Sequence, residues 1–384
     1  MYAPVYLDHN ASTPMAPEVV DAVARALADL FGNASSIHSY GQRAKAALDD
    51  ARTHVARLIA AEPGDIVFTA SGTEADNLAL RGVVDAAGPS RPRVIVTAVE
   101  HEAVINTAQA MGRRGTPVTI LPVDAAGVVQ PSALEDALGS DVAVVSVLLA
   151  NNETGVIQPI EALARQARAR RVVFHTDAVQ AVGKIAVDVA ALGVDLLSLS
   201  AHKFGGPKGA GALWVRRGTP MAGVITGGRQ ERNRRAGTEN VPAIVGLGAA
   251  ARLAKARLTE ESARQTRLRD ALEAGILGIV PGTAVNGAGA PRVPNTTNIA
   301  FEKVEAESLL IALDLEGIAV STGAACSSGT LEPSHVLRAM GLPQGRVQSS
   351  IRFSVGTTTT EQDVERVLSV LPALVQRLRA VGRR

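Results

Sequence analysis

The sequence predicts an α/β fold in which a large domain with a mostly parallel sheet, wrapped by helices, is joined to a smaller α+β domain. Two observations carry this prediction. Short runs rich in β-branched residues alternate with helical patterns over the first two thirds of the 384 residues. A long stretch rich in Ala, Arg and Glu, at about 240–280, then separates this region from a second set of strand-like and helix-like segments.

The expected strands of the large domain are short and apolar, and polar residues follow most of them. They lie at 66–70, 93–99, 142–150, 171–175, 195–200 and 211–217. Between them, apolar residues recur at spacings of three and four, which is typical of helices with one buried face. In the first helix this face consists of Val19, Val20, Val23, Leu27 and Leu30, and we expect these side chains in the core.

The last third of the chain has its own strands and helices. NTTNIAFEKV, GIAVST and SSIRFSV are typical of strands, and helices are expected from about residue 305, from Pro333 and from about residue 360. We therefore expect an N-terminal segment, 1–15, that packs with the small domain. A large domain then covers 16–257, and a small C-terminal domain covers 258–384.

Composition excludes several classes of protein. One cysteine allows no intramolecular disulfide, and the N-terminus has neither the basic start nor the apolar run of a secretion signal, so we expect a cytoplasmic protein. No apolar run approaches the ~18 residues of a membrane span. A net charge of +2 gives no field suited to a polyanion. The arginine-rich run at 228–237 lacks interleaved aromatic residues, which favours anion handling and subunit packing over nucleic-acid binding.

Polar residues stand where the predicted strands end, and ligands of parallel sheets bind at that edge. After 66–70 comes SGTEADN, a turn that opens a helix and offers the N–H groups of Gly72 and Thr73 to a phosphate. The alternative is a plain N-cap made by Ser71 or Thr73. No glycine motif of a dinucleotide or triphosphate site is present.

The next strands deliver His101, the NNETG turn, Asp177 with Gln180, and Ser200 with His202 and Lys203. A carboxylate and an amine beside such apolar strands are costly unless they are paired or occupied. A structural salt bridge is one explanation for Asp177 and Lys203. The other is a pyridoxal phosphate site, in which Lys203 carries the aldehyde as a Schiff base and Asp177 holds a proton on the ring nitrogen.

A set of motifs spanning nearly the whole chain resembles the cysteine desulfurases, which are pyridoxal phosphate enzymes of fold type I in the class V aminotransferase group. The similarity is closest to their nitrogenase-associated and housekeeping iron–sulfur branch. The motifs are LDHNASTP, FGNASSIHSYG, FTASGTEADN, EHEAV, ANNETG, FHTDAVQAVGK, SAHKFGGPKGAG, RAGTEN, TGAACSSGTLEPSHVLRAMG and SSIRFSVG. The resemblance implies that 16–257 binds the cofactor and that 258–384 carries the catalytic cysteine loop.

The resemblance also implies roles for single residues. Lys203 would carry the cofactor, Asp177 would be the partner of the ring nitrogen, and His101 would stack on the ring. Asn152 and Gln180 would meet the ring's phenolic oxygen, and Asn152 would also lie at the substrate. Gly72, Thr73, Ser200 and His202 would hold the phosphate. Thr238 would reach the phosphate in the neighbouring subunit of a homodimer, and Arg352 would bind the substrate carboxylate, unless it only forms a buried Arg–Asp pair.

Cys326 lies among small and polar residues, which is unlike the apolar surroundings of a filler thiol. The resemblance implies that it takes sulfur from L-cysteine, giving L-alanine and a persulfide on Cys326. The sulfur would pass to an iron–sulfur scaffold, in nitrogenase maturation or general cluster assembly, or to another thiolation acceptor. Cys326 cannot form a metal site by itself, and a transient iron–sulfur ligand role would need a partner's ligands. The alternatives are a selenocysteine lyase, another class V aminotransferase-type enzyme, or a non-catalytic sulfur-transfer scaffold.

Overall fold

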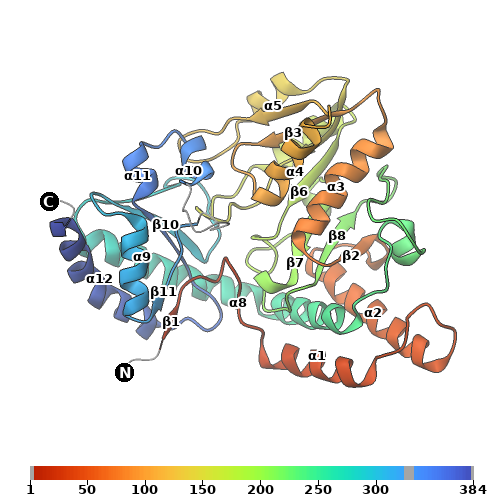
Figure 1. Cartoon of the computed structure of the whole chain (residues 1–384), viewed down its shortest axis with the longest axis horizontal. Coiled ribbons are helices and arrows are strands. Elements are labelled where there is room, and N and C mark those ends of the chain that lie inside the picture. The colour runs from red at the N-terminus through yellow and green to blue at the C-terminus, as the bar shows by residue number, and fades with distance from the viewer. Residues whose placement is uncertain (1–3, 324–332, 382–384) are drawn as a thin grey trace.

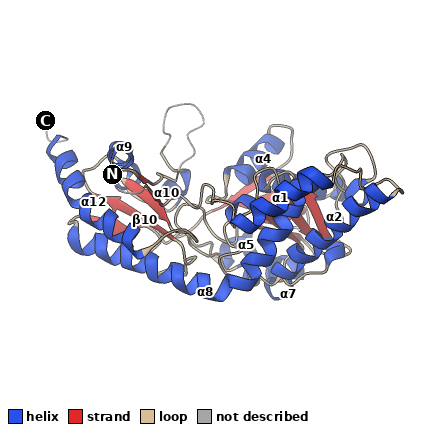
Figure 2. Ribbon diagram, turned by 90° about the horizontal axis from the view of Figure 1, so that it is seen from below, coloured by secondary structure: helices blue, strands red, loops and turns tan. Residues whose placement is uncertain are grey.

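The structure, a computed structural model, describes residues 4–323 and 333–381, and it has two lobes of unequal size. The large lobe is built on a seven-stranded sheet and the small lobe on a three-stranded sheet (Figure 1). One helix, α8 (Val241–Ile279), runs beneath both lobes (Figure 2). Both chain ends lie at the small lobe (Figure 1).

The large sheet has the strand order β2-β8-β7-β6-β5-β3-β4. All neighbouring pairs among β3 to β7 are parallel, and β8 alone runs antiparallel to its two neighbours. The prediction of a mostly parallel sheet is therefore confirmed. The strands are β2 (Ile66–Thr69), β3 (Arg93–Thr97), β4 (Val118–Leu121), β5 (Val142–Ser146), β6 (Val173–Asp177), β7 (Leu196–Ser200) and β8 (Gly211–Val215).

Helices cover both faces of this sheet, because neighbouring strand residues point to opposite sides. In β2, Ile66 and Phe68 join one buried cluster while Val67 joins another. Helices α3 (Gly72–Ala87) and α4 (Glu102–Gly112) cover the Val67 side. The other side is covered by α2 (Ser39–Leu58), α5 (Pro131–Ala137), α6 (Ile160–Ala169), α7 (Val189–Leu192) and the first part of α8.

The small lobe contains the antiparallel sheet β12-β10-β9, made of β12 (Ser350–Ser354), β10 (Thr296–Phe301) and β9 (Thr283–Val285). The N-terminal segment also belongs here, because β1 (Val5–Tyr6) pairs in parallel with β11 (Ile318–Ala319). The remaining helices are α9 (Ala306–Leu315), α10 (His335–Ala339), α11 (Gln344–Gln348) and α12 (Glu361–Val381).

Helix α8 crosses the expected boundary between 257 and 258 without a break. Its first part packs on α2 and on α1 (Pro17–Asp29), and its later part packs on α12. The two lobes thus share one continuous helix, and the exact domain limits stay a prediction.

Two sequence expectations need correction. Strands β4 and β9 were not expected; β4 is only partly buried, and β9 has three residues, so both patterns are weak. The expected core face of the first helix is wrong in part, since Val19 is buried but Leu27 is 66% exposed and Val20 is 44% exposed. In the described part of the chain, no helix is long and apolar enough to cross a membrane.

Candidate active site

A cavity of about 350 Å³ lies at the carboxyl ends of the parallel strands, where the large sheet meets the small lobe. The N-terminal segment contributes Asn10 and Ala11, and the small lobe contributes Ser321, Gly323 and Arg352. Most of the residues predicted from the sequence line this one cavity. They are Gly72, Thr73, His101, Asn152, Asp177, Gln180, Ser200, His202, Lys203 and Arg352.

The start of α3 forms one wall of the cavity. Ser71 is the N-cap, because its Oγ accepts the Glu74 N–H at 3.0 Å, and Glu74 Oε2 accepts the Ala70 N–H at 3.0 Å. Ser71 therefore forms the N-cap that was the alternative to a phosphate site. This cap still leaves the first-turn N–H groups of Gly72 and Thr73 without an intrahelical partner. A Cβ at Gly72 would lie 2.8 Å from Val179 Cγ2, so the wall has room only for glycine.

Asp177 ends β6 and is almost fully buried. Its Oδ1 accepts the Val179 N–H at 2.9 Å. Burial raises the pKa of this carboxyl, while His101 and Lys203 oppose the rise. A buried carboxyl of this kind is stabilised as an anion by a nearby cation or by a proton held between it and a ring nitrogen. The Asp177 carboxylate can therefore stabilise a protonated ring nitrogen of a ligand in the cavity.

A second carboxyl, Asp76, also lines the cavity and was missed by the sequence analysis. Burial raises its pKa well above the usual value, and Asp177 adds to the rise. His175 Nε2 lies 3.6 Å from Asp76 Oδ1, and the ring also contacts Ser146 and Ser198 at 2.8 and 2.9 Å. Burial lowers the pKa of His175 to about 3, so the ring is neutral.

His101 is both a helix cap and a cavity residue. Its Nδ1 accepts the Ala103 N–H at 3.1 Å, at the start of α4. An acceptor nitrogen carries no proton, so the neutral ring has its proton on Nε2. Desolvation by the surrounding protein lowers the pKa of His101, although Asp177 raises it. The cap fixes the ring's position, and the cavity lies beside it.

Lys203 follows β7 in a short 3₁₀ turn, Ala201–Lys203. Its Nζ donates to the backbone oxygens of Asn10 at 2.6 Å and Ala11 at 2.9 Å. Burial and then Arg352 lower the pKa of this amine to about 8, while Asp177 and Asp8 raise it. An amine with such a pKa has a substantial neutral fraction near neutral pH, which a nucleophile or base needs.

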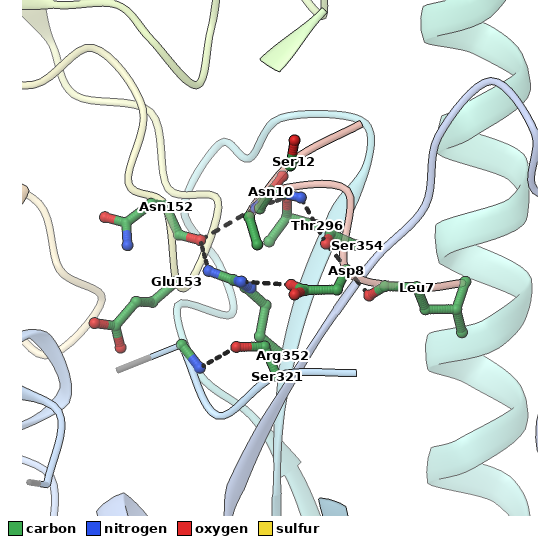
Figure 3. Close-up of polar contacts among 12 residues, drawn as sticks. Leu7, Asp8, Asn10, Ser12, Asn152, Glu153, Thr296, Ser321, Arg352 and Ser354 are labelled. Atoms are coloured by element: carbon green, nitrogen blue, oxygen red, sulfur yellow. Dashed lines mark hydrogen bonds and ion pairs between the residues drawn. The ribbon is translucent and has the colours of Figure 1, made fainter. Parts of the chain in front are cut away.

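Arg352 reaches the cavity from β12 and is 4% exposed. Its guanidinium donates to Asp8 Oδ1 at 2.7 Å and to Asn152 O at 2.9 Å (Figure 3). The buried Arg–Asp pair, which was the alternative to a substrate-binding role for Arg352, is therefore present. Among the described residues, however, the Nε atom has no hydrogen-bond partner. Because Arg352 lines the cavity, its guanidinium can donate to a further oxygen there.

Asn10 is a functional residue that sequence reasoning missed, although its motif LDHNASTP was part of the resemblance. Its backbone oxygen accepts the Gln180 Nε2 at 2.9 Å as well as Lys203. Its Oδ1 accepts the buried Lys184 Nζ at 3.0 Å, and Lys184 also donates to Gln180 Oε1 at 2.5 Å. Its Nδ2 donates to Asn152 O at 3.1 Å (Figure 3). Asn10 therefore connects the groups around the cavity.

Two predicted residues do not line the cavity. Thr238 is exposed, follows the arginine-rich run and is not among the described residues that line the cavity. Cys326 lies outside the described residues, between Gly323, which lines the cavity, and Pro333. Among the residues that the structure describes, no group of three or more His, Cys, Asp or Glu side chains could hold a metal ion.

Comparisons with known proteins identify several relatives of this chain. A cysteine desulfurase of Trichormus azollae is 47% identical over 98% of this chain and 94% of its own length. The cysteine desulfurase IscS of Methanosarcina thermophila is 46% identical, over 98% and 93%. Among solved structures, a NifS-like protein superimposes with a TM-score of 0.91 at 34% identity and covers 98% of this chain and 100% of its own. The NifS-like protein of Rickettsia africae gives a TM-score of 0.87 at 32% identity, with coverages of 97% and 99%.

The resemblance to the cysteine desulfurases, and the α/β fold that it implied, are confirmed by these matches. The profile of the family described as Aminotransferase class-V matches residues 5–367, which is nearly the whole chain. The chain therefore belongs to the class-V aminotransferase family.

Proposed function

We propose that this protein is a pyridoxal phosphate-dependent cysteine desulfurase, which converts L-cysteine to L-alanine and collects the sulfur as a persulfide on Cys326. The observation that carries the proposal is the single cavity that gathers Lys203, Asp177, His101 and Arg352 beside the start of α3. The relatives named cysteine desulfurase, at 46% to 48% identity over nearly the whole chain, support it.

The residues of the cavity fit pyridoxal phosphate. The start of α3 lines the cavity with Gly72 and with first-turn N–H groups that have no intrahelical partner, which suits a phosphate. Asp177 is a buried carboxyl that would hold a proton on the ring nitrogen, and Lys203 is an amine with a lowered pKa for the aldehyde. We infer that Ser200 and His202 also meet the phosphate. When bound, the cofactor accepts the electron pair that is left on the substrate's Cα after deprotonation.

The side chains of the protein would then have separate roles in the reaction. Lys203 Nζ would remove the Cα proton and later return a proton to the substrate. Arg352, which lines the cavity, would donate from its guanidinium to the substrate carboxylate. Gln180, held in place by Lys184 and Asn10, would present its Nε2 toward the ring's phenolic oxygen together with Asn152. His101, fixed by its cap bond to Ala103, would pack on the ring face.

Cys326 would perform the sulfur transfer. Its thiolate would attack the substrate sulfur, so that a new S–S bond forms while the substrate Cβ–S bond breaks. The electron pair of the broken bond would stay with the substrate carbon, which takes a proton and leaves as alanine. Cys326 is the only thiol in the chain, so no other residue could carry the persulfide. The sulfur would then pass to an iron–sulfur scaffold or another acceptor protein.

We also propose a homodimer in which Thr238 reaches the phosphate in the neighbouring subunit. Large apolar side chains gather on and between α1 and α2: Phe31 is 73% exposed and Ile37 is 92% exposed, and Leu27 and Tyr40 are also exposed. Such a patch is unusual for a surface that faces water alone. The exposure of Thr238 leaves it free to act outside its own subunit. The cytoplasmic location stays a prediction.

The deciding experiment uses the purified protein with added pyridoxal phosphate and L-cysteine. We expect alanine and a protein-bound persulfide in stoichiometric first turnover, and we expect Cys326→Ala to keep the cofactor's visible absorbance but to form no alanine. Lys203→Ala should lose both. Alanine formation that survives in Cys326→Ala would instead indicate a selenocysteine lyase or another class V aminotransferase-type reaction. Partner binding without any turnover in the unsubstituted protein would indicate a non-catalytic scaffold.

A further inference from the structure

Glu153 is a buried carboxyl, 2% exposed, that none of the roles above uses. It belongs to the NNETG turn beyond β5, and its backbone is fixed on both sides. Asn151 Oδ1 accepts the N–H groups of Glu153 and Thr154, each at 2.9 Å, and Asn298 Nδ2 donates to Glu153 O at 3.2 Å. The Glu153 side chain therefore extends from a rigid point beside Asn152 and Arg352 (Figure 3).

On one side the carboxyl packs against Gly323, the last described residue before the segment that carries Cys326. A Cβ at Gly323 would lie 3.0 Å from Glu153 Cγ and 3.1 Å from Glu153 Oε2, and the φ angle of Gly323 is +86°. Both facts require glycine here. The chain just before it is also held, since Ser321 exchanges backbone hydrogen bonds with Arg352 at 3.2 and 2.6 Å.

On the other side the same carboxyl holds the chain that follows the cysteine segment. Ser334 Oγ donates to Glu153 Oε2 at 2.5 Å. The same hydroxyl accepts the Leu337 N–H at 3.0 Å and so caps α10. Ser334 is itself buried. The Glu153 side chain therefore bonds Ser334 on one side of 324–332 and packs beside Gly323 on the other.

We propose that Glu153 is a positioning residue for the proposed desulfurase reaction: it bonds Ser334 and packs beside Gly323 at the edge of the cavity, and thereby limits where the Cys326 thiol can reach. This inference rests on the proposed function. Cys326 is three residues from Gly323, so its Cα stays within roughly 11 Å of a residue that lines the cavity. If Gly323 moves, the range of the thiol moves with it, and small displacements of a reacting group slow reactions steeply.

The test uses the full-length holoenzyme and two variants of the same residue. Glu153→Ala removes both contacts, whereas Glu153→Gln keeps the shape and an oxygen that can accept from Ser334. The matched control is Glu273→Ala. Glu273 also accepts from a hydroxyl, Thr297 Oγ1 at 2.6 Å, and from Arg292, but it touches neither Gly323 nor Ser334.

We expect Glu153→Ala to lower kcat for alanine formation by about 10- to 100-fold, with KM for L-cysteine and cofactor affinity within about twofold of the unsubstituted protein. Glu153→Gln should restore most of kcat. The Gly323 N–H donates to Ser321 Oγ and the Leu337 N–H donates to Ser334 Oγ. Amide hydrogen exchange at both should be faster in Glu153→Ala, because Gly323 loses the side chain that packs beside it and Ser334 loses the acceptor that orients its hydroxyl. Glu273→Ala should change none of these quantities.

An unchanged kcat in Glu153→Ala would overturn the inference, and so would exchange rates at Gly323 and Leu337 that stay as in the unsubstituted protein. A parallel loss of cofactor affinity would also contradict it, since Glu153 would then act on the cofactor site as a whole. The same experiment distinguishes a failure of this inference from a failure of the proposed function. If the unsubstituted protein forms no alanine, that proposal fails, while hydrogen exchange still decides whether Glu153 holds the two chain ends.

Discussion

Glu100 offers a direct test of the electrostatics around the site. It follows β3, is fully buried, and precedes His101 in the chain. Its Oε1 accepts the Thr97 hydroxyl at 2.9 Å and the Leu148 N–H at 3.0 Å, while its Oε2 has no partner among the described residues. Burial raises the pKa of this carboxyl from 4.5 to about 8, because water no longer solvates the anion.

The pKa shift fixes the sign and size of a pH effect on stability. Below pH 4.5 the carboxyl is protonated in both the folded and the unfolded chain, so it contributes nothing. Between pH 4.5 and about 8 the unfolded chain releases this proton and the folded chain keeps it, so the free energy of unfolding falls as pH rises. At about 1.4 kcal/mol per pH unit, the loss reaches about 3 kcal/mol at pH 7.

The substitution Glu100→Gln should remove this loss. The amide oxygen can still accept from Thr97 and Leu148, and the amide nitrogen replaces the protonated oxygen without a charge. We expect the free energy of unfolding to rise by about 1–3 kcal/mol at pH 7 and to change little at pH 5. Urea unfolding at both pH values measures this, with Glu135→Gln on the exposed face of α5 as the control. If Glu100→Gln loses as much stability between pH 5 and 7 as the unsubstituted protein does, the reasoning is refuted.

Three further predictions concern the cavity. Arg352→Lys should raise KM for L-cysteine by about 10- to 100-fold, because an ammonium cannot donate in the bidentate way of a guanidinium; steady-state kinetics that leave KM unchanged would exclude substrate binding by Arg352. Asp177→Asn should retain bound cofactor in absorbance spectra but form alanine at least about 100-fold more slowly, since an amide cannot hold the ring nitrogen protonated; a near-normal rate contradicts this role. Gly72→Ala should weaken cofactor affinity by about tenfold, because the added Cβ would lie 2.8 Å from Val179 Cγ2 and would disturb the start of α3. Titration of the cofactor-free protein with pyridoxal phosphate measures this affinity. An unchanged affinity would show that the start of α3 does not bind the phosphate.

The parts of the site that could be predicted from the sequence share one physical origin. Asp177 and Lys203 come directly after apolar strands, and parallel strands bring their carboxyl ends to one edge of the sheet. The order of strands along the chain therefore predicts which polar residues converge. The same logic predicted the glycine turn at α3 and the NNETG turn, which line the cavity as well.

The parts that could not be predicted depend on contacts between segments far apart in the chain. Asn10 lies in a segment with little regular structure, and its importance follows from partners such as Lys184, Thr296 and Ser354. No local pattern encodes such partners. Leu27 shows what a local pattern leaves open. Its helical spacing correctly predicts an apolar helix face, but the spacing does not predict whether other residues cover that face.

The contacts of Asn10 also explain why the two lobes can share one site. Its backbone N–H donates to Ser354 Oγ of β12 at 3.0 Å, and its Nδ2 donates to Thr296 Oγ1 of β10 at 2.8 Å. Its backbone oxygen accepts Lys203 Nζ of the large lobe. Because one residue bonds to both lobes, a rotation of the small lobe against the large one would break several buried hydrogen bonds together, each costing about 1–3 kcal/mol. The hydrogen bonds of Asn10 therefore hold the two lobes together at the cavity.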